Sequence, residues 1–248
     1  MKDQPKISVI IPCYNSEEWI EECLLSVADQ TYTNIEIIVV DNESTDTTLD
    51  IVNTIKEKYD NITVSSAPNI YPHCWDEARE VGFSLATGDY YLTICSDDYL
   101  DTNFISNCVI VINNTPEDTL AFQSPIKGVK VSDEFPFFME YQVHVYKDIK
   151  EFKEKCLVHC PVNTPTVIFH ESLYKKGLLK TDPDTYSGAA DYDLYCSLAE
   201  SGVFIYPIPQ WVGYYYRWHE NQATWGVRNS GVSYDTLIRN HWREKWTS

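Results

Sequence analysis

Two adjacent carboxylates, Asp97 and Asp98, directly follow the apolar segment Tyr90–Cys95. Carboxylates this close repel each other when ionised, unless a cation or a hydrogen-bond network compensates. Mg²⁺ and Mn²⁺ bind carboxylate oxygens and leave coordination positions for phosphate oxygens. The pair therefore indicates a metal–diphosphate site. The alternative is that Asp97 or Asp98 caps a helix that begins near Asn103.

Polar turns also follow two earlier apolar segments. Pro12 to Asn15 comes after Ile7 to Ile11, and Asp41 to Asp46 comes after Ile35 to Val40. In open parallel sheets, ligands bind at the carboxyl ends of the strands. We therefore expect these turns to lie beside Ser96 to Asp98 in one ligand site.

Four more candidate residues lie in the last third of the chain. Asp191 begins a predicted helix, where capping is the structural interpretation, and Asp193 projects from a different face of that helix. Arg217 and His219 alternate on a strand-like segment, so their side chains should share one face. In a segment rich in Trp and Tyr, the arginine is equally consistent with a solvated edge or a cation–π contact.

Strand-like and helix-like segments alternate in the first half of the chain. Asn15 is a predicted helix N-cap, with Glu18 completing a capping box. A second helix should begin near Asp46. The remaining predicted elements of this half are strands at Ile62–Ser65 and Tyr90–Cys95 and a helix at Trp75–Leu85. This order predicts βαβ units and a parallel sheet with right-handed connections.

After Asp98 the pattern is looser. The predicted helices are Phe104–Ile112, Asp191–Glu200 and Tyr234–Trp246, and the predicted strands are Leu120–Ser124, Thr166–Phe169 and Trp211–Trp218. No linker, low-complexity tract or internal repeat divides the chain. We therefore expect a single α/β domain over residues 1–248.

Composition excludes several classes of protein. The net charge of −18 disfavours binding to nucleic acid and to anionic membranes. The dinucleotide motif GxGxxG and the P-loop motif GxxxxGK[ST] are absent. No targeting segment or membrane span is predicted, and the eight cysteines form no CxxC pair, so we expect reduced thiols and a cytoplasmic location. Cys156, His159 and Cys160 lack a fourth nearby metal ligand, which favours structural thiols.

Six segments of the chain, in order and at similar spacing, resemble motifs of glycosyltransferase family 2. They are SVIIPCYN (8–15), QTYTNIEIIVVDNESTDTT (30–48), ARExG (78–82), GDYYLTICSDD (88–98), ADYDLYCSLAESG (190–202) and YYRWHENQAT (215–224). Together they extend over nearly the whole chain. The resemblance implies a GT-A fold, which is a mixed, mainly parallel sheet flanked by helices. It also implies a Rossmann-like nucleotide-sugar-binding half at about 1–98, an acceptor-binding half at about 99–224 and a C-terminal helical extension at 225–248.

The resemblance also implies roles for individual residues. Pro12, Tyr14 and Asn15 would frame the nucleotide, and Asp41 with Asn42 would contact its base or ribose. The other implied contacts are Arg79 at the ribose–diphosphate region, Asp97 at the ribose or sugar, Arg217 at the diphosphate, and Asp98 with His219 at Mn²⁺ or Mg²⁺. Asp191 would be the general base that deprotonates the acceptor hydroxyl in an inverting transfer.

The implied reaction transfers a sugar from a nucleotide-diphosphate sugar, which we expect to be UDP-linked, to a glycan or lipid-linked saccharide. A nucleotidyltransferase and a non-catalytic sugar-nucleotide-binding protein are the alternatives. This chain departs from the family pattern at Asn42, Glu43 and Ala190, where an aspartate, a glycine and an acidic residue are common. Aromatic residues in 135–146 and 211–225 suit an acceptor cleft. The basic and aromatic segment 239–246 suits either a peripheral membrane contact or an oligomer contact.

Overall fold

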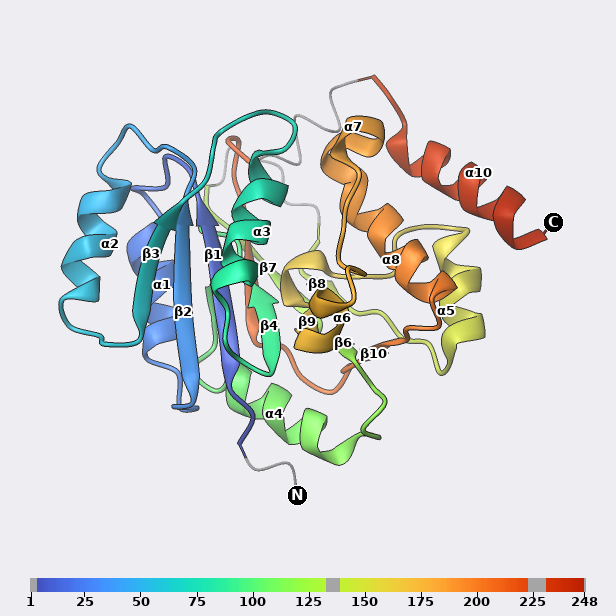
Figure 1. Ribbon diagram of the computed structural model, residues 1–248, viewed down its shortest axis with the longest axis horizontal. Coiled ribbons are helices and arrows are strands. Elements are labelled where there is room, and N and C mark those ends of the chain that lie inside the picture. The colour runs from blue at the N-terminus through green and yellow to red at the C-terminus, as the bar shows by residue number, and fades with distance from the viewer. Residues whose placement is uncertain (1–3, 133–138, 223–230, 248) are drawn as a thin grey trace.

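The computed structural model describes residues 4–132, 139–222 and 231–247. Figure 1 shows a central sheet with helices on both sides. Parts of the aromatic segments 135–146 and 211–225 lie outside the described residues, so the expected acceptor cleft is described only in part. Within the described residues, no helix is long and apolar enough to span a bilayer.

The main sheet has seven strands in the order β10-β6-β9-β4-β1-β2-β3. The strands are β1 (Ile7–Cys13), β2 (Ile35–Asp41), β3 (Ile62–Ser66), β4 (Tyr90–Thr93), β6 (Ala121–Gln123), β9 (Ile168–His170) and β10 (Ile205–Pro207). All neighbours pair in parallel except β9, which runs antiparallel to both β4 and β6. The continuously apolar segments of β1 and β2 are buried on both faces, as a covered parallel strand requires.

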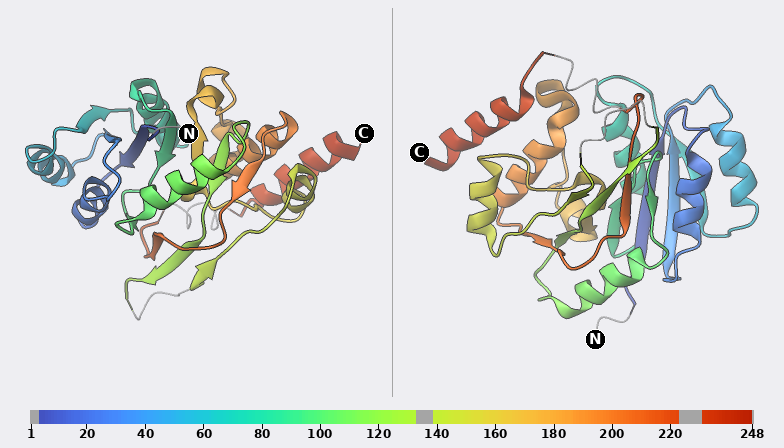
Figure 2. Two further views of the ribbon diagram at one scale, coloured as in Figure 1. Left: turned by 90° about the horizontal axis from the view of Figure 1, so that it is seen from below. Right: turned by 180° about the vertical axis from the view of Figure 1, so that it is seen from behind.

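Helices cover both faces of this sheet (Figure 2). They are α1 (Ile20–Ala28), α2 (Thr48–Lys56), α3 (Cys74–Leu85), α4 (Phe104–Asn114), α5 (Ile149–Cys156), α6 (Glu171–Lys175), α7 (Pro183–Tyr186), α8 (Ala190–Glu200) and α10 (Tyr234–Thr247), with 3₁₀ turns η1 (Thr164–Thr166) and η2 (Ser187–Ala189). On one face Val9 packs in a core with α1, α2 and α4, and on the other Ile10 packs with α3, α5 and α8. Alternate residues of one strand thus supply two separate cores.

A smaller sheet of four strands lies beside the main sheet. Its order is β5 (Tyr99–Leu100), β11 (Tyr214–Trp218), β7 (Ile126–Lys130) and β8 (Tyr141–Gln142). β11 runs antiparallel to β5 and parallel to β7. Because β5 directly follows Asp98, this pairing brings residues 214–218 to the carboxyl end of β4.

The predicted cap at Asn15 is wrong. α1 begins at Ile20, and its N-cap position, Trp19, makes no side-chain cap hydrogen bond. Asn15 instead adopts a left-handed conformation, with φ of 45°, and its side chain accepts a hydrogen bond from the Thr45 amide at 2.8 Å. The side chain therefore joins two loops rather than capping a helix.

The C-terminal helix packs on the protein through its aromatic residues. The Trp242 side chain is buried, and its indole nitrogen donates to Asp193 at 2.7 Å. Trp246 donates to Glu200 at 2.7 Å. The two tryptophans thus attach α10 to α8, and the membrane contact of this segment stays a prediction.

Candidate active site

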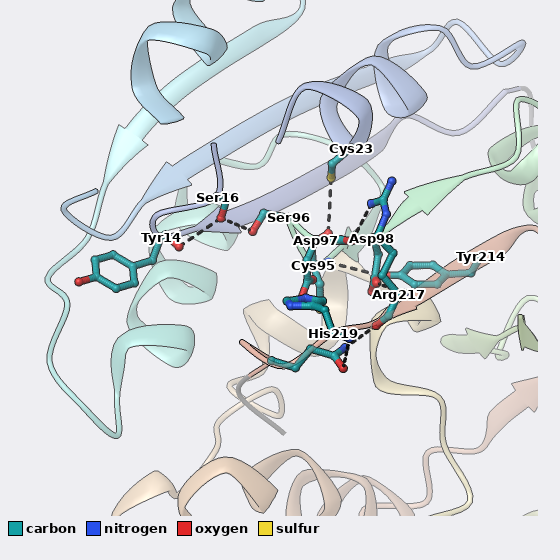
Figure 3. Close-up of polar contacts among 11 residues, drawn as sticks. Tyr14, Ser16, Cys23, Cys95, Ser96, Asp97, Asp98, Tyr214, Arg217 and His219 are labelled. Carbon is teal, nitrogen blue, oxygen red and sulfur yellow. Dashed lines mark hydrogen bonds and ion pairs between the residues drawn. The ribbon is translucent and has the colours of Figure 1, made fainter. Parts of the chain in front are cut away.

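Asp97 and Asp98 lie in the turn that follows β4, beside Tyr214, Arg217 and His219 (Figure 3). Asp98 is fully buried, accepting a hydrogen bond from the Tyr214 hydroxyl at 2.7 Å and another from the Arg217 amide at 2.9 Å. Burial, and then the charge of Asp97, raise the pKa of Asp98 well above its usual value. The Asp97 side chain retains 25% exposure and lies 3.0 Å from His219 Nε2. Asp97 is therefore the more exposed carboxylate of the pair.

The capping alternative for these carboxylates is wrong. Asp101 Oδ1 accepts the hydrogen bond from the Asn103 amide, at 2.9 Å, at the start of α4. Asp97 and Asp98 both bond to residues of the β11 region instead. Their position is thus set by the second sheet and not by the following helix.

Arg217 and His219 share one face, as the alternation predicted. Both contact Trp19, at 5.1 Å from the guanidinium carbon to the ring centre and 5.3 Å between ring centres. The buried Arg217 guanidinium also lies 4.5 Å above Tyr99, donates to the Asp97 carbonyl at 2.6 Å and pairs with Glu22. The predicted cation–π contact is therefore present. The diphosphate role of Arg217 stays a prediction.

The donor atoms in this turn suit a divalent cation. Among the described residues, ligand atoms of Cys95, Asp97 and Asp98 lie within 4.8 Å of one another. Asp97 Oδ2 and His219 Nε2 are in hydrogen-bond contact at 3.0 Å, so a carboxylate oxygen and an imidazole nitrogen that could both hold a cation lie side by side. Imidazole favours a transition metal over Mg²⁺, so the pair fits Mn²⁺ better. The Asp98 oxygens, in contrast, already accept two protein hydrogen bonds.

The loops after β1 and β2 are braced against each other beside this turn. The Asn15 amide donates to Ser44 Oγ at 3.0 Å, and the Ser16 and Ser96 hydroxyls lie 2.8 Å apart. Pro12 is buried within β1, whereas Tyr14 is 48% exposed. The predicted nucleotide-framing residues Pro12, Tyr14 and Asn15 thus lie at the carboxyl edge that also carries Ser96.

Asp41 and Asn42 are both buried, and their side chains form hydrogen bonds with nearby backbone groups. Asp41 accepts a hydrogen bond from the Ser44 amide at 3.0 Å. Asn42 donates to the carbonyls of Pro68 and Cys74 at 3.2 Å and 3.0 Å, which an aspartate could not do. Asn42 thereby ties the end of β2 to the start of α3. The predicted contacts with base or ribose stay predictions.

Glu43 adopts the left-handed conformation that glycine favours, with φ of 61°. Glycine is common here in the family, so the position keeps that backbone shape without the residue that adopts it most easily. The turn that follows β2 therefore has a left-handed residue at this position, although its sequence departs from the family pattern there.

Asp191 is half-buried in the first turn of α8, not at its cap position, which is Ala189. Its Oδ1 accepts from the Tyr192 amide at 2.8 Å, and its Oδ2 accepts from the Thr164 hydroxyl. Burial raises the pKa of Asp191, as suits a proton acceptor. Asp193 is instead committed to Trp242. Of the two carboxylates, Asp191 is therefore the one that bonds to Thr164 of η1.

The antiparallel strand β9 brings the Asp191 region toward Asp97. β9 pairs with β4 through Leu92 and Ile168, so the start of β9 lies near the carboxyl end of β4. η1, which contains Thr164, directly precedes β9 and packs against β4. Thr164 in turn bonds to Asp191. The base candidate is therefore connected to the carboxyl end of β4 through one short segment.

Arg79 on α3 is buried on the other side of Asp191. It donates to Thr181 Oγ1 at 3.1 Å and pairs with Asp76 at 3.3 Å. Its charge lowers the pKa of Asp191, against the larger effect of burial. Arg79 is thus held by α3 and by the segment that precedes α7, and its predicted contact with the ribose–diphosphate region stays a prediction.

Sequence reasoning missed Glu22, Thr164 and Tyr214 as site residues. Glu22 and Tyr214 contact Arg217 and Asp98, which are distant in sequence. No local motif marks them, because their contacts depend on the β5–β11 pairing. Thr164 follows Asn163 and precedes Pro165, a turn signal without any indication of its partner.

The fold and the site define an α/β enzyme domain with acidic and imidazole side chains at the carboxyl edge of a mainly parallel sheet. The sequence model for "Glycosyl transferase family 2" matches residues 8–181. The chain therefore belongs to glycosyltransferase family 2, and its fold is GT-A. This membership supports the expected glycosyltransferase and not the nucleotidyltransferase.

Relatives with named activities match mainly over part of the chain. The chain is similar to a poly(ribitol-phosphate) beta-glucosyltransferase of Bacillus spizizenii, with 44% identity over 102 residues, 38% of this chain and 15% of the relative. It is similar to the poly(ribitol-phosphate) beta-N-acetylglucosaminyltransferase TarS of Staphylococcus aureus, with 36% identity over 128 residues, 50% of this chain and 21% of TarS. The chain thus spans well under two thirds of these proteins.

Solved structures support the same fold over most of the chain. The structure of S. aureus TarS 1–349 in complex with UDP-GlcNAc has a TM-score of 0.68 and 25% identity, covering 92% of this chain and 62% of TarS 1–349. A mannosyltransferase from Pyrobaculum calidifontis, in complex with GDP-Man and Mn²⁺, has a TM-score of 0.62 at 18% identity, covering 92% of this chain and 61% of that one. The latter similarity concerns the fold alone.

Proposed function

We propose that this chain is an inverting, cation-dependent glycosyltransferase that takes its sugar from a UDP-sugar. The observation that carries the proposal is the Asp97–His219 pair, 3.0 Å apart at the carboxyl edge of the sheet in a member of family 2. Support for UDP comes from TarS, whose structures include complexes with UDP and UDP-GlcNAc.

The two neighbouring carboxylates have different roles in this proposal. Asp97, with His219, is assigned to the cation because its side chain is the exposed member of the pair. This assignment departs from the sequence-based expectation, which gave the metal to Asp98. Asp98 is assigned to holding the β11 segment, since its oxygens bind Tyr214 and the Arg217 amide. When bound, the cation neutralises charge that develops on the departing diphosphate.

Asp191 is assigned as the general base. Its carboxylate accepts the proton of the acceptor hydroxyl while that oxygen attacks the anomeric carbon and the nucleotide diphosphate leaves from the opposite face. A carboxylate with a raised pKa is the stronger base for this step. Arg79 nearby limits that increase, so that Asp191 keeps its ionised form more readily.

For the acceptor, we infer a saccharide, either free in a glycan chain or linked to a lipid. Relatives are named for poly(ribitol-phosphate) and for a GlcNAc-diphosphoundecaprenol acceptor, the latter an Escherichia coli enzyme with 40% identity over 101 residues. All of these acceptors present a hydroxyl on a polyol or sugar, which is the group that a carboxylate base requires.

The donor site is tested by thermal melting with UDP, GDP, dTDP and CMP, each with and without Mn²⁺. A ligand that binds only the folded state raises Tm. We expect the largest rise with UDP plus Mn²⁺, and its loss in Asp97→Asn and His219→Ala. Asp89→Asn, at the amino end of β4, is the matched control because the Asp89 side chain accepts a hydrogen bond from the Lys6 amide, at the opposite end of the strand from the site. A metal-dependent rise that survives in Asp97→Asn but not in Asp98→Asn would reverse the assignment.

The base is tested by UDP release from UDP-glucose and UDP-N-acetylglucosamine. In Asp191→Asn we expect turnover to fall at least about a hundredfold, within the range typical of general-base catalysis, while the Mn²⁺-dependent Tm rise with UDP is retained. Normal turnover in Asp191→Asn would show that another group accepts the proton.

A further inference from the structure

The Asp191 carboxylate is held by one hydrogen bond to each oxygen. The Tyr192 amide donates to Oδ1 at 2.8 Å, and the Thr164 hydroxyl donates to Oδ2. The amide belongs to the next residue of the same helix, so this hydrogen bond depends on no other segment of the chain. The hydroxyl comes from a separate segment, η1, and its presence depends on how that segment is placed.

A buried polar network fixes η1 at the end of β6. The Asn163 amide donates to Gln123 Oε1 at 2.9 Å, and Asn163 Nδ2 donates to the Ser124 carbonyl at 2.9 Å. Thr166 Oγ1 also donates to the Ser124 carbonyl, at 3.1 Å. Gln123, Ser124, Asn163 and Thr166 are each at most 3% exposed. Buried networks of this kind rigidify the segment that carries them.

Thr164 is the residue of η1 whose hydroxyl bonds outside this network. Asn163 and Thr166 bond to the chain at the end of β6, whereas Thr164 is half-buried and bonds to Asp191. Its hydroxyl also interacts with the buried Tyr195. The network therefore has a consequence beyond its own stability, because it delivers one hydroxyl donor to the carboxylate on α8.

We propose that Thr164 is a positioning residue for the general base: its hydroxyl orients the Asp191 carboxylate and stabilises the ionised form that accepts the proton. The inference rests on the proposed role of Asp191. A hydrogen bond donated to a carboxylate favours the anion over the acid. Loss of the donor therefore makes Asp191 easier to protonate and free to rotate about its side-chain bonds.

Other groups also act on Asp191. The titratable and charged side chains that face it are Asp76 and Arg79 from α3, Cys160 from the segment after α5, and Tyr195 from α8 itself. The Thr164 hydrogen bond and the charge of Arg79 both lower the pKa of Asp191, and Thr164 is the one whose side chain bonds to the carboxylate. Removing the Thr164 hydroxyl therefore deletes a direct hydrogen bond to Asp191.

The direct test measures the Asp191 pKa by NMR titration of protein labelled with ¹³C at the aspartate carboxyl groups. The Asp191 resonance is identified by its absence in Asp191→Asn, so no substrate is needed. We expect Thr164→Val to raise this pKa by about one pH unit, and Thr164→Ser, which keeps the hydroxyl, to leave it near the value of the unmodified chain. Thr54→Val, an exposed position on α2, controls for the chemical change.

The second readout is the pH profile of UDP release. Because Asp191 must be ionised to accept a proton, a higher pKa moves the acid limb of the kcat profile to higher pH. We expect Thr164→Val to lower kcat most on the acid side of the profile, where Asp191 is partly protonated, and to recover as the pH rises, with the KM for UDP-sugar unchanged. Thr164→Ser should restore most of the rate. If Thr164→Val fails to fold, Thr164→Ala gives the same comparison.

Two results would overturn the inference. An unchanged Asp191 pKa in Thr164→Val, or a rate loss that is equal in Thr164→Ser and independent of pH, would assign Thr164 a structural role only. Failure of the base assignment is recognised separately, because Asp191→Asn would then keep its turnover whatever the Thr164 variants do.

Discussion

The hydrogen bond between Tyr214 and Asp98 should carry much of the stability of the turn that follows β4. Tyr214 and Asp98 are both fully buried, and their oxygens are 2.7 Å apart. The same hydroxyl accepts a hydrogen bond from the Cys95 amide at 3.3 Å. Tyr214→Phe keeps the ring and its contact with Phe104, and it removes only the hydroxyl.

A hydrogen bond to a charged group contributes about 1.5–3 kcal/mol, and one between neutral groups about 0.5–1.5 kcal/mol. With Asp98 ionised, we expect Tyr214→Phe to lower the free energy of unfolding by about 2 kcal/mol. For a chain of this size that corresponds to a fall in Tm of about 4–8 °C. A fall of only about 2–4 °C would indicate that burial keeps Asp98 protonated.

The assay is thermal unfolding at neutral pH, followed by circular dichroism. Tyr215→Phe is the matched control, since the Tyr215 ring stacks on Tyr99 at 4.8 Å and the substitution keeps that ring. We expect the control to melt within about 1 °C of the unmodified chain. If Tyr214→Phe also melted within that range, the buried hydroxyl would not be supporting Asp98, and the argument for a structural Asp98 would fail.

Three further substitutions test the framework of the site. Burial opposes ionisation of Glu36, but hydrogen bonds from Lys6, Ser8 and Thr87 lower its pKa to about 2. The stabilisation from these bonds is therefore present above pH 4.5 and is lost as the pH falls toward 2. Glu36→Gln should flatten that part of a curve of Tm against pH. Gly82→Ala would drive a methyl group into Ile10 and should cost about 1–3 kcal/mol in urea unfolding, whereas an unchanged midpoint would contradict close packing of α3 on β1. Asn42→Asp restores the residue common in the family but faces two carbonyl oxygens, so we expect a loss of about 2 kcal/mol in the same assay, and a gain would show that the loop rearranges.

The first half of the chain was predictable from sequence because its signals are local. Continuous apolar runs such as Ile7–Ile11 and Ile35–Val40 indicate strands covered on both faces, and the structure has β1 and β2 there. The polar turns were predicted at the carboxyl ends of those strands, which is where they lie. The cap at Asn15 failed because a capping residue and a loop-bridging residue have the same chemistry, and only the Thr45 amide decides between them.

The second half was less predictable because its contacts connect distant segments. β7 (Ile126–Lys130) alternates weakly and pairs with β8 and with β11, the latter almost ninety residues later in the chain. The insertion of β9 between β4 and β6 has no sequence signal either. Which of Asp97 and Asp98 is buried also depends on β11. The Tyr214 hydroxyl of that strand binds Asp98, whereas Asp97 contacts His219 just beyond the strand.

The continuity of the seven-stranded sheet limits how such a chain can be divided or recombined. β6, β9 and β10 come from the half assigned to the acceptor, and they extend the sheet that begins with β1 to β4. A cut after residue 98 would leave the edge of β4 unpaired and open to association with other chains. If whole halves were exchanged between relatives, β4 of one protein would have to pair with β9 of the other. Change of acceptor in this architecture is therefore expected to proceed through the loops that leave the sheet, with the strands themselves inherited as one unit.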